Sequence, residues 1–268
     1  MSQRIKVGPD GFVELRDVMG NDAAICEAAR VSYDQAKKVS DDRTLIRYLM
    51  RHHHTTPFEM AELKFIVRAP MDVWRQWVRH RTASINEYST RYKEAIDSAA
   101  IPDWGEWRTQ STTNKQGSGQ ILPEDYGSHC TRDFADATDA CREAYKKLIA
   151  RGVAREQARS VLQLATYTEA FWKIDLHNLL HFMRLRMAPD AQQEIREYAN
   201  AIHDLVAPLF PFTFEAFADY RLDAIQLTAV DIAAIKNNDW QGVQISNKRE
   251  RDEYLAKIKA LYLGGNHE

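Results

Sequence analysis

A proline at position 70 separates two segments with different hydrophobic patterns, and this junction limits the folds open to the chain. In residues 63–69, LKFIVRA, apolar and charged residues partly alternate, which predicts a strand that ends at the proline. In residues 70–79 the apolar side chains share one arc of a helical wheel: Val73, Trp74, Trp77 and Val78. Arg75, Gln76 and Arg79 fall on the opposite arc, which predicts an amphipathic helix begun by proline. A strand followed at once by a helix favours a mixed fold.

Helical spacing and capping residues predict most of the other elements. Helices are expected at residues 21–29, 40–50, 130–151, 175–186, 191–209 and 247–263, with a shorter helix carrying Arg155 and Arg159. A second strand is expected at residues 165–174, which are rich in aromatic and β-branched side chains. Residues 93–127 are the least patterned, and their STTNKQGSGQ core is interpreted as a surface excursion. Helices therefore dominate the predicted fold.

The composition narrows the class of protein. A formal net charge of -2 gives no overall polyanion signal, so any cationic site must be local. No apolar run approaches the roughly 20 residues that a membrane helix needs, and the first residues lack the apolar core of a signal peptide, so we expect a cytoplasmic protein. The cysteines Cys26, Cys130 and Cys141 are odd in number and lack metal-like spacing, which argues against a disulfide framework or zinc site.

The run RHRTASINEYSTRY, residues 79–92, concentrates groups that bind anions. Arg79, His80 and Arg81 are followed after seven residues by Ser89, with an amide and a carboxylate between them. The residues after Arg81 favour loops, so the run is predicted to leave the end of the preceding helix as a loop and to bind a phosphorylated ligand. A solvated basic helix end is the alternative interpretation.

Two further segments carry histidines. Residues 51–59 read RHHHTTPFE, but consecutive side chains point in different directions, so His54 and Thr56 are favoured as ligand-facing residues over a metal site. On the helix after Asp175, His177, His181 and Arg184 share one face, and Arg186 lies near its end. The histidine pair has the spacing of metal ligands but no HExxH signature, so contact with an aromatic ring or a phosphate is an equal alternative.

These three segments, in this order, resemble the flavin-dependent thymidylate synthases. The family signature RHR-x7-S is matched by Arg79, His80, Arg81 and Ser89. Six similar blocks lie in order between residues 11 and 220: GFVELRDVMGND, AARVSYD, HTTPFE, RQWVRHR, REQARSVL and WKIDLHNLLHFMRLR. One departure is the segment Met187-Ala188-Pro189-Asp190, where some relatives place a histidine beside FAD, so Asp190 is left without a role.

The resemblance implies a methyltransferase of nucleotide biosynthesis. Such enzymes convert dUMP to dTMP, with 5,10-methylenetetrahydrofolate as carbon donor and with hydride from FAD that NADPH has reduced. It also implies an α+β (mixed α/β) fold, with a central, mostly antiparallel sheet flanked by helices and a helix-rich C-terminal half. The assembly would be a homotetramer with shared active sites that binds neither nucleic acid nor membrane. The catalytic domain is expected at residues 1–225, and residues 226–268 are expected to be a C-terminal helical extension of unknown role.

The resemblance assigns site residues position by position. The dUMP-binding residues are expected to be Gln76, Arg79, Glu87, Tyr88, Ser89, Arg91, Arg159 and Arg186. The FAD-binding residues are expected to be Ser32, Thr56, Glu59, Arg79, His80, Arg81, Asn86, Asp175, His177 and His181. Arg186, His54 and Ser89 are the expected catalytic residues, and no metal ligand is expected. Because none of the cysteines lies in the matching blocks, hydride transfer directly to uracil is expected, with Ser89 binding phosphate and not acting as a nucleophile.

Two rival interpretations explain one segment each. A nucleic-acid-binding module would use the cluster Arg75, Arg79, Arg81 and Arg91, together with Trp74, Trp77 and Tyr88. A metal hydrolase would use residues 52–54 with His177 and His181. The synthase interpretation accounts for all six blocks.

Overall fold

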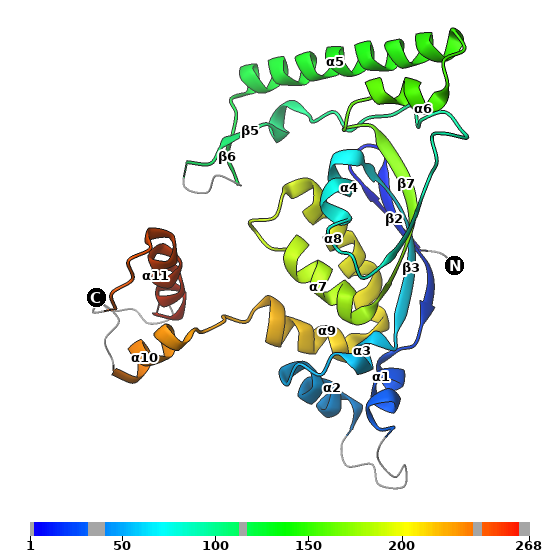
Figure 1. Ribbon diagram of the computed structural model, residues 1–268. Helices are drawn as coiled ribbons and strands as arrows, with labels where there is room; N and C mark the ends of the chain where they lie inside the picture. The colour runs from blue at the N-terminus through cyan, green and yellow to red at the C-terminus, as the bar shows by residue number, and fades with distance from the viewer. Residues whose placement is uncertain (1–2, 32–40, 113–116, 238–242, 263–268) are drawn as a thin grey trace. The chain divides into compact units, whose positions relative to one another are not determined.

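The strand predicted before Pro70 is the middle strand of a five-stranded sheet (Figure 1). The computed structural model describes residues 3–31, 41–112, 117–237 and 243–262. All neighbouring strands of this sheet are antiparallel, and the order is β1-β2-β3-β7-β4. The strands are β1 (Gln3–Val7), β2 (Gly11–Met19), β3 (Glu62–Pro70), β4 (Ser84–Glu87) and β7 (Tyr167–Asp175). The expected mixed fold with an antiparallel sheet is confirmed.

Strands β3 and β7 pair along their whole length and form the centre of the core. Glu62 lies opposite Asp175, and Pro70 lies opposite Tyr167. Alternate residues bury one face: Leu63, Phe65, Val67 and Ala69 from β3, with Ala170, Trp172 and Ile174 from β7. Because each strand leads directly into a helix, α4 (Met71–Trp77) and α7 (Leu176–Arg186) begin at opposite ends of this pair. Both then pack on the buried face, where the Trp172 ring centroid lies 5.1 Å from those of Trp77 and Phe182.

The first compact unit, Met1–Phe217, contains further helices. They are α1 (Asp22–Ala29), α2 (Asp42–Arg51), α3 (Thr56–Glu59), α5 (Glu124–Ala150), α6 (Arg155–Ala158), α8 (Gln193–Val206) and α9 (Pro211–Phe217). Short 3-10 turns are η1 (Trp104–Glu106), η2 (Arg159–Val161) and η3 (Ala207–Leu209), and β5 (Arg108–Gln110) pairs with β6 (Ser118–Ile121). Asp175 caps α7, and Gly152, which follows the C-cap residue of α5, has a φ of 81° that favours glycine.

Some local expectations are corrected by the structure. The segment after Arg81, predicted to be a loop, contains β4, whose four residues are all exposed and pair with the edge of β7. Val78 was placed on the apolar arc but is 44% exposed, because α4 ends at Trp77. Helix α5 begins at Glu124, ahead of the expected start near Cys130. Strands β1 and β2, and the β5–β6 pair, were not predicted.

The second compact unit, Ala218–Glu268, contains a π-helical turn η4 (Ala218–Leu222) and the helices α10 (Ala229–Asn237) and α11 (Lys248–Tyr262). Asp231 is 1% exposed and accepts hydrogen bonds from the backbone N–H and the hydroxyl of Thr228. Its carboxylate also pairs with Lys257, which links α10 to α11. The unit begins within residues 1–225, the part of the chain expected to be catalytic. In the described ranges, no helix is both long and apolar enough to cross a membrane.

Asp22 joins two helices that are far apart in the sequence. Asp22 is 7% exposed, and its carboxylate accepts hydrogen bonds from Phe212 N at 2.7 Å, Thr213 N at 3.2 Å and Thr213 Oγ1 at 2.6 Å. Asp22→Ala leaves these donors buried without an acceptor, so we expect the free energy of unfolding to fall by about 3 kcal/mol. Urea denaturation would measure this. Asp204→Ala, at a carboxylate that is 68% exposed, is the control, and a loss at Asp22 no larger than the loss at Asp204 would contradict the assignment.

Candidate functional site

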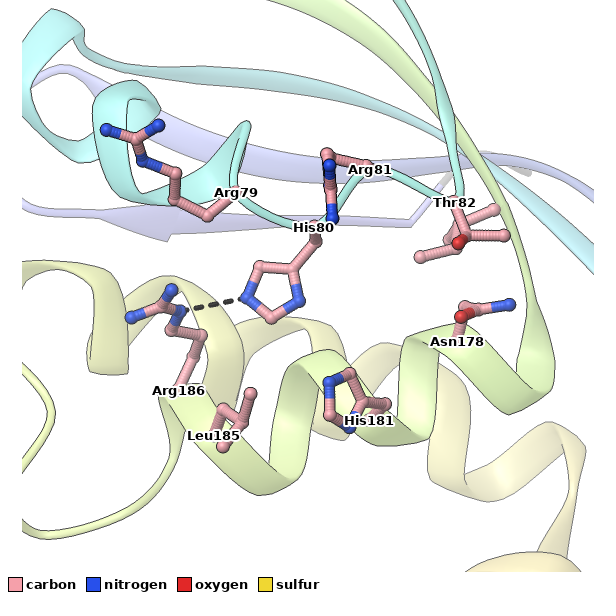
Figure 2. A pocket seen from close by; sticks show the side chains of 9 residues that line it. Arg79, His80, Arg81, Thr82, Asn178, His181, Leu185 and Arg186 are labelled. Carbon is pink, nitrogen blue, oxygen red and sulfur yellow. Dashed lines mark hydrogen bonds between the residues drawn. The ribbon is translucent and has the colours of Figure 1, made fainter.

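The Arg79–Arg81 segment and helix α7 enclose a pocket of about 320 Å³ (Figure 2). Its lining residues are Arg79, His80, Arg81 and Thr82 from the segment after α4, Ile174 from β7, and Asn178, His181, Leu185 and Arg186 from α7. The antiparallel pairing of β3 and β7 explains why the segment after α4 lies beside α7, since both helices run back across the same face of the sheet. Five of the predicted site residues therefore line one pocket.

Arg186 is a half-buried cation at one end of this pocket. Its Nε donates to His80 Nε2 at 3.0 Å, and its Nη2 donates to the Gln76 carbonyl oxygen at 3.3 Å. Within the described part of the chain, no carboxylate pairs with this guanidinium. Burial lowers the pKa of Arg186, but an arginine remains protonated in proteins. A desolvated cation without a counter-ion is suited to a ligand that carries or develops negative charge.

His80 is neutral at physiological pH. Burial, together with the nearby charges of Arg186 and His181, lowers its pKa to about 4. Its ring packs edge-on against Phe182, with centroids 4.8 Å apart. Since Nε2 accepts the bond from Arg186, the hydrogen-bond network assigns the ring proton to Nδ1. His80 therefore combines one satisfied acceptor with one remaining N–H donor.

The lowered pKa of His80 predicts a pH dependence of stability. The folded-state pKa of about 4 lies below the usual histidine value of about 6.5, so between these pH values the unfolded chain binds more protons. The free energy of unfolding is therefore expected to fall as the pH is lowered from about 6.5 towards 4. His80→Gln should make this dependence shallower, which urea denaturation across that pH range would measure. Equal slopes for the two proteins would contradict the assignment.

On α7 the pocket-lining face differs from the face predicted on the helical wheel at two of its three positions. His181 lines the pocket as predicted, but His177 and Arg184 do not belong to its lining. Asn178 and Leu185, which are spaced three and four residues from His181, take part instead. This helical spacing could have indicated that Asn178 and Leu185 share a face with His181. The polar residues His177 and Arg184 favoured the other face in the sequence analysis.

A second group of predicted residues gathers where the chain leaves β4. Arg159 Nη1 donates to Thr90 Oγ1 at 2.9 Å, and Arg91 Nη2 pairs with Glu156 at 3.1 Å. The Arg91 backbone N–H donates to Ser89 Oγ at 3.4 Å. Residues 89–91 therefore lie against α6 and η2, which brings Ser89, Arg91 and Arg159 into one exposed cationic group that we call the Ser89 group.

The other predicted residues lie around these two places. His54 is exposed, with its ring centroid 5.7 Å from that of Tyr48, while Thr56 and Glu59 are the first and last residues of α3, which contacts α7. Glu87 accepts from Thr168 Oγ1 at 2.8 Å, and the Tyr88 hydroxyl donates to the Glu94 carbonyl at 2.9 Å. Gln76 donates from its side chain to Gln192, and Asn86 lies exposed on β4. Ser32 lies outside the described residues.

The structure gives observations against both alternatives, the nucleic-acid-binding module and the metal hydrolase. Trp74 and Trp77 are 6% and 0% exposed, so neither indole is available to stack on a base, as a nucleic-acid-binding module would need. Over the described ranges, no group of three or more His, Cys, Asp or Glu side chains is arranged to hold a metal ion. Cys26 is buried, and burial and the charge of Asp42 raise the pKa of its thiol to about 12, which disfavours the thiolate.

Comparison with known proteins decides the family. The model of a family described as thymidylate synthase complementing protein matches residues 14–212. A flavin-dependent thymidylate synthase from Dictyostelium discoideum is 44% identical, over 96% of this chain and 87% of that protein. Another, from Ruegeria pomeroyi, is 47% identical over 84% of this chain and 76% of that protein. The chain belongs to the flavin-dependent thymidylate synthase family.

A solved structure gives the same relationship in three dimensions. The UMP/dUMP methylase PolB from Streptomyces cacaoi, crystallised with 5-Br UMP, has a TM-score of 0.74 and 35% sequence identity to this chain. The similarity covers 81% of this chain and 98% of PolB. The pocket, the Ser89 group and helix α3 all lie inside residues 14–212, the part matched by the synthase family model.

Proposed function

We propose that this chain is a flavin-dependent thymidylate synthase that methylates dUMP to dTMP, with 5,10-methylenetetrahydrofolate as carbon donor and NADPH as reductant of FAD. The observation that carries the proposal is Arg186, a half-buried guanidinium whose partners are a neutral imidazole and a backbone carbonyl. A fixed cation of this kind stabilises negative charge that develops on the carbonyl oxygens of a uracil ring. Arg186 is therefore assigned to the uracil ring.

The chemistry of the pocket fits a flavin. Arg79, Arg81 and the His80 N–H supply hydrogen-bond donors for its carbonyl oxygens and ring nitrogens, and in the described part of the chain neither Arg79 nor Arg81 has a carboxylate partner. When bound, reduced FAD would supply a hydride for the uracil ring. The residues proposed to hold it are Ser32, Thr56, Glu59, Arg79, His80, Arg81, Asn86, Asp175, His177 and His181. His54 is proposed to act at the approach of the folate.

The Ser89 group is proposed to bind the nucleotide phosphate. Arg91 and Arg159 supply charge-assisted donors, and the Ser89 hydroxyl adds a neutral one. Gln76, Glu87 and Tyr88 are proposed to complete the nucleotide site with Arg79 and Arg186. We propose that the protein is a cytoplasmic homotetramer. The pocket, the Ser89 group and helix α3 of different subunits would share one active site in it.

Product formation tests the proposal. The purified protein, supplied with dUMP, 5,10-methylenetetrahydrofolate, NADPH and FAD, is expected to form dTMP, which chromatography detects. Omission of either the folate or the reductant should abolish the product. Formation of dTMP without any reductant, or no dTMP with all components present, would overturn the assignment.

Ser89→Ala separates phosphate binding from nucleophilic attack. No histidine, carboxylate or lysine side chain is bonded to Ser89 Oγ among the described residues, so the hydroxyl lacks the base that an attacking serine needs. The variant is therefore expected to raise the KM for dUMP about tenfold, the cost of one hydrogen bond to a charged group, with kcat nearly unchanged. Steady-state kinetics measure both constants. A loss of turnover at saturating dUMP with unchanged nucleotide affinity would contradict this role.

A further inference from the structure

Asn178 lines the pocket, and neither its spacing nor the family resemblance gave it a role. Its backbone N–H donates to Asp175 Oδ1 at 2.9 Å, and its side-chain Nδ2 donates to Asp175 Oδ2 at 2.8 Å. Both oxygens of the capping carboxylate are thus engaged by the same residue. Asp175 therefore holds the side chain of Asn178 as well as the first turn of α7.

This contact sets the orientation of the Asn178 amide. A carboxylate only accepts hydrogen bonds, so the NH2 group must face Asp175, and the Oδ1 atom faces the other way. In the described part of the chain Oδ1 has no hydrogen-bond partner, and it is not a buried unsatisfied atom. Figure 2 shows Asn178 on α7 facing Thr82, and His181 on the same helix beside His80. The pocket therefore contains an acceptor of fixed orientation in a wall made mostly of donors.

That pattern fits a cyclic imide. A cyclic imide presents a carbonyl, an N–H and a second carbonyl along one edge, so its partner needs donors for the two oxygens and an acceptor for the nitrogen. Arg81 and His80 supply donors in the lining of this pocket, and Asn178 Oδ1 is the acceptor. We propose that Asn178 recognises the imide N–H of the ligand in this pocket, and that Asp175 acts through Asn178 as a positioning residue. This inference rests on the proposed function, because flavin and uracil both carry such an imide.

Ligands methylated at the imide nitrogen test the proposal. The methyl group removes the donor, so an acceptor would be left unpaired and binding should weaken at least tenfold. Affinities are measured on the flavin-free protein for FAD against 3-methyl-FAD by flavin fluorescence, and for dUMP against 3-methyl-dUMP by calorimetry. If only the FAD pair differs in affinity, Asn178 binds the flavin imide, and if only the dUMP pair differs, it binds the uracil imide. In Asn178→Ala the same pair should differ by less than about threefold.

Matched variants separate recognition from folding. Asn200→Ala, at an exposed asparagine on α8, should keep the full discrimination. Asp175→Asn keeps a capping side chain but no longer fixes the amide, so its discrimination should lie between those of the parent and Asn178→Ala. Thermal denaturation checks that each variant is folded, and Asn178→Ser replaces Asn178→Ala if the latter is not.

The outcomes distinguish this inference from the proposed function. A parent protein that discriminates, with an Asn178 variant that does not, supports the role of Asn178. A folded Asn178 variant that retains the parent's discrimination for both ligand pairs, or a parent that binds methylated and unmethylated ligands equally, would overturn it and leave the proposed function standing. A parent that binds neither FAD nor dUMP would overturn both.

Discussion

Arg186→Lys is expected to lower kcat/KM for dUMP by about 10²–10³-fold, the scale for loss of a fixed charge-stabilising donor. The lysine keeps one positive charge but not the planar fork that lets Arg186 reach His80 Nε2 and the Gln76 carbonyl together while other N–H groups stay free. The ammonium is also more strongly hydrated, so a half-buried position suits it less. Steady-state kinetics with dUMP as the varied substrate measure the effect.

Arg184→Lys is the matched control for this variant. Arg184 lies on the same helix, is exposed, and is absent from the pocket lining. We expect its kcat/KM to stay within about twofold of the parent, since surface changes away from special contacts have small effects. Both substitutions keep the positive charge, so equal losses at Arg184 and Arg186 would mean that the effect does not depend on the position of the Arg186 guanidinium.

Arg81→Ala is expected to weaken FAD binding by about 10–100-fold, which corresponds to the loss of a hydrogen bond involving a charged group. Arg81 lines the pocket, and in the described part of the chain it has no carboxylate to neutralise it, so its charge is available to a ligand. Quenching of flavin fluorescence, titrated with flavin-free protein, gives the dissociation constant without any need for turnover.

Arg75→Ala tests whether that effect is local. Arg75 is an exposed arginine on α4, close in sequence but outside the pocket lining. Its removal lowers the net charge by the same amount, so the affinity for FAD should change by no more than about twofold, because exposed charges are screened by salt. If both variants weakened binding equally, the attraction would be a general electrostatic one and Arg81 would not be a specific contact.

Local sequence signals predicted the elements that build the pocket. Pro70 and Asp175 mark the starts of α4 and α7 through preferences that act within one turn of helix, so both starts could be placed from the sequence. The buried strands β3 and β7 are evident in their apolar, β-branched and aromatic residues. Strand β4 could not be predicted in this way, because its residues are exposed and its conformation depends on pairing with the distant β7.

The sequence predicted most of the residues of the candidate site but not how they are arranged. The family resemblance assigned Arg79, His80, Arg81, His181 and Arg186 to the FAD and dUMP sites, and in the structure all of them line one pocket. The role of Asn178 could not be predicted, since it depends on which face of α7 meets the segment after α4. The neutral state of His80 likewise requires its burial beside Arg186, which no sequence pattern shows.

The visible absorption spectrum of the purified protein tests the central claim most directly. After addition of FAD and removal of the excess, the protein is expected to be yellow, and its flavin band should bleach under anaerobic conditions when NADPH is added in the presence of dUMP. The band should return when oxygen is admitted. A protein that stays colourless after incubation with FAD, or a bound flavin that NADPH and dUMP together fail to bleach, would contradict the account.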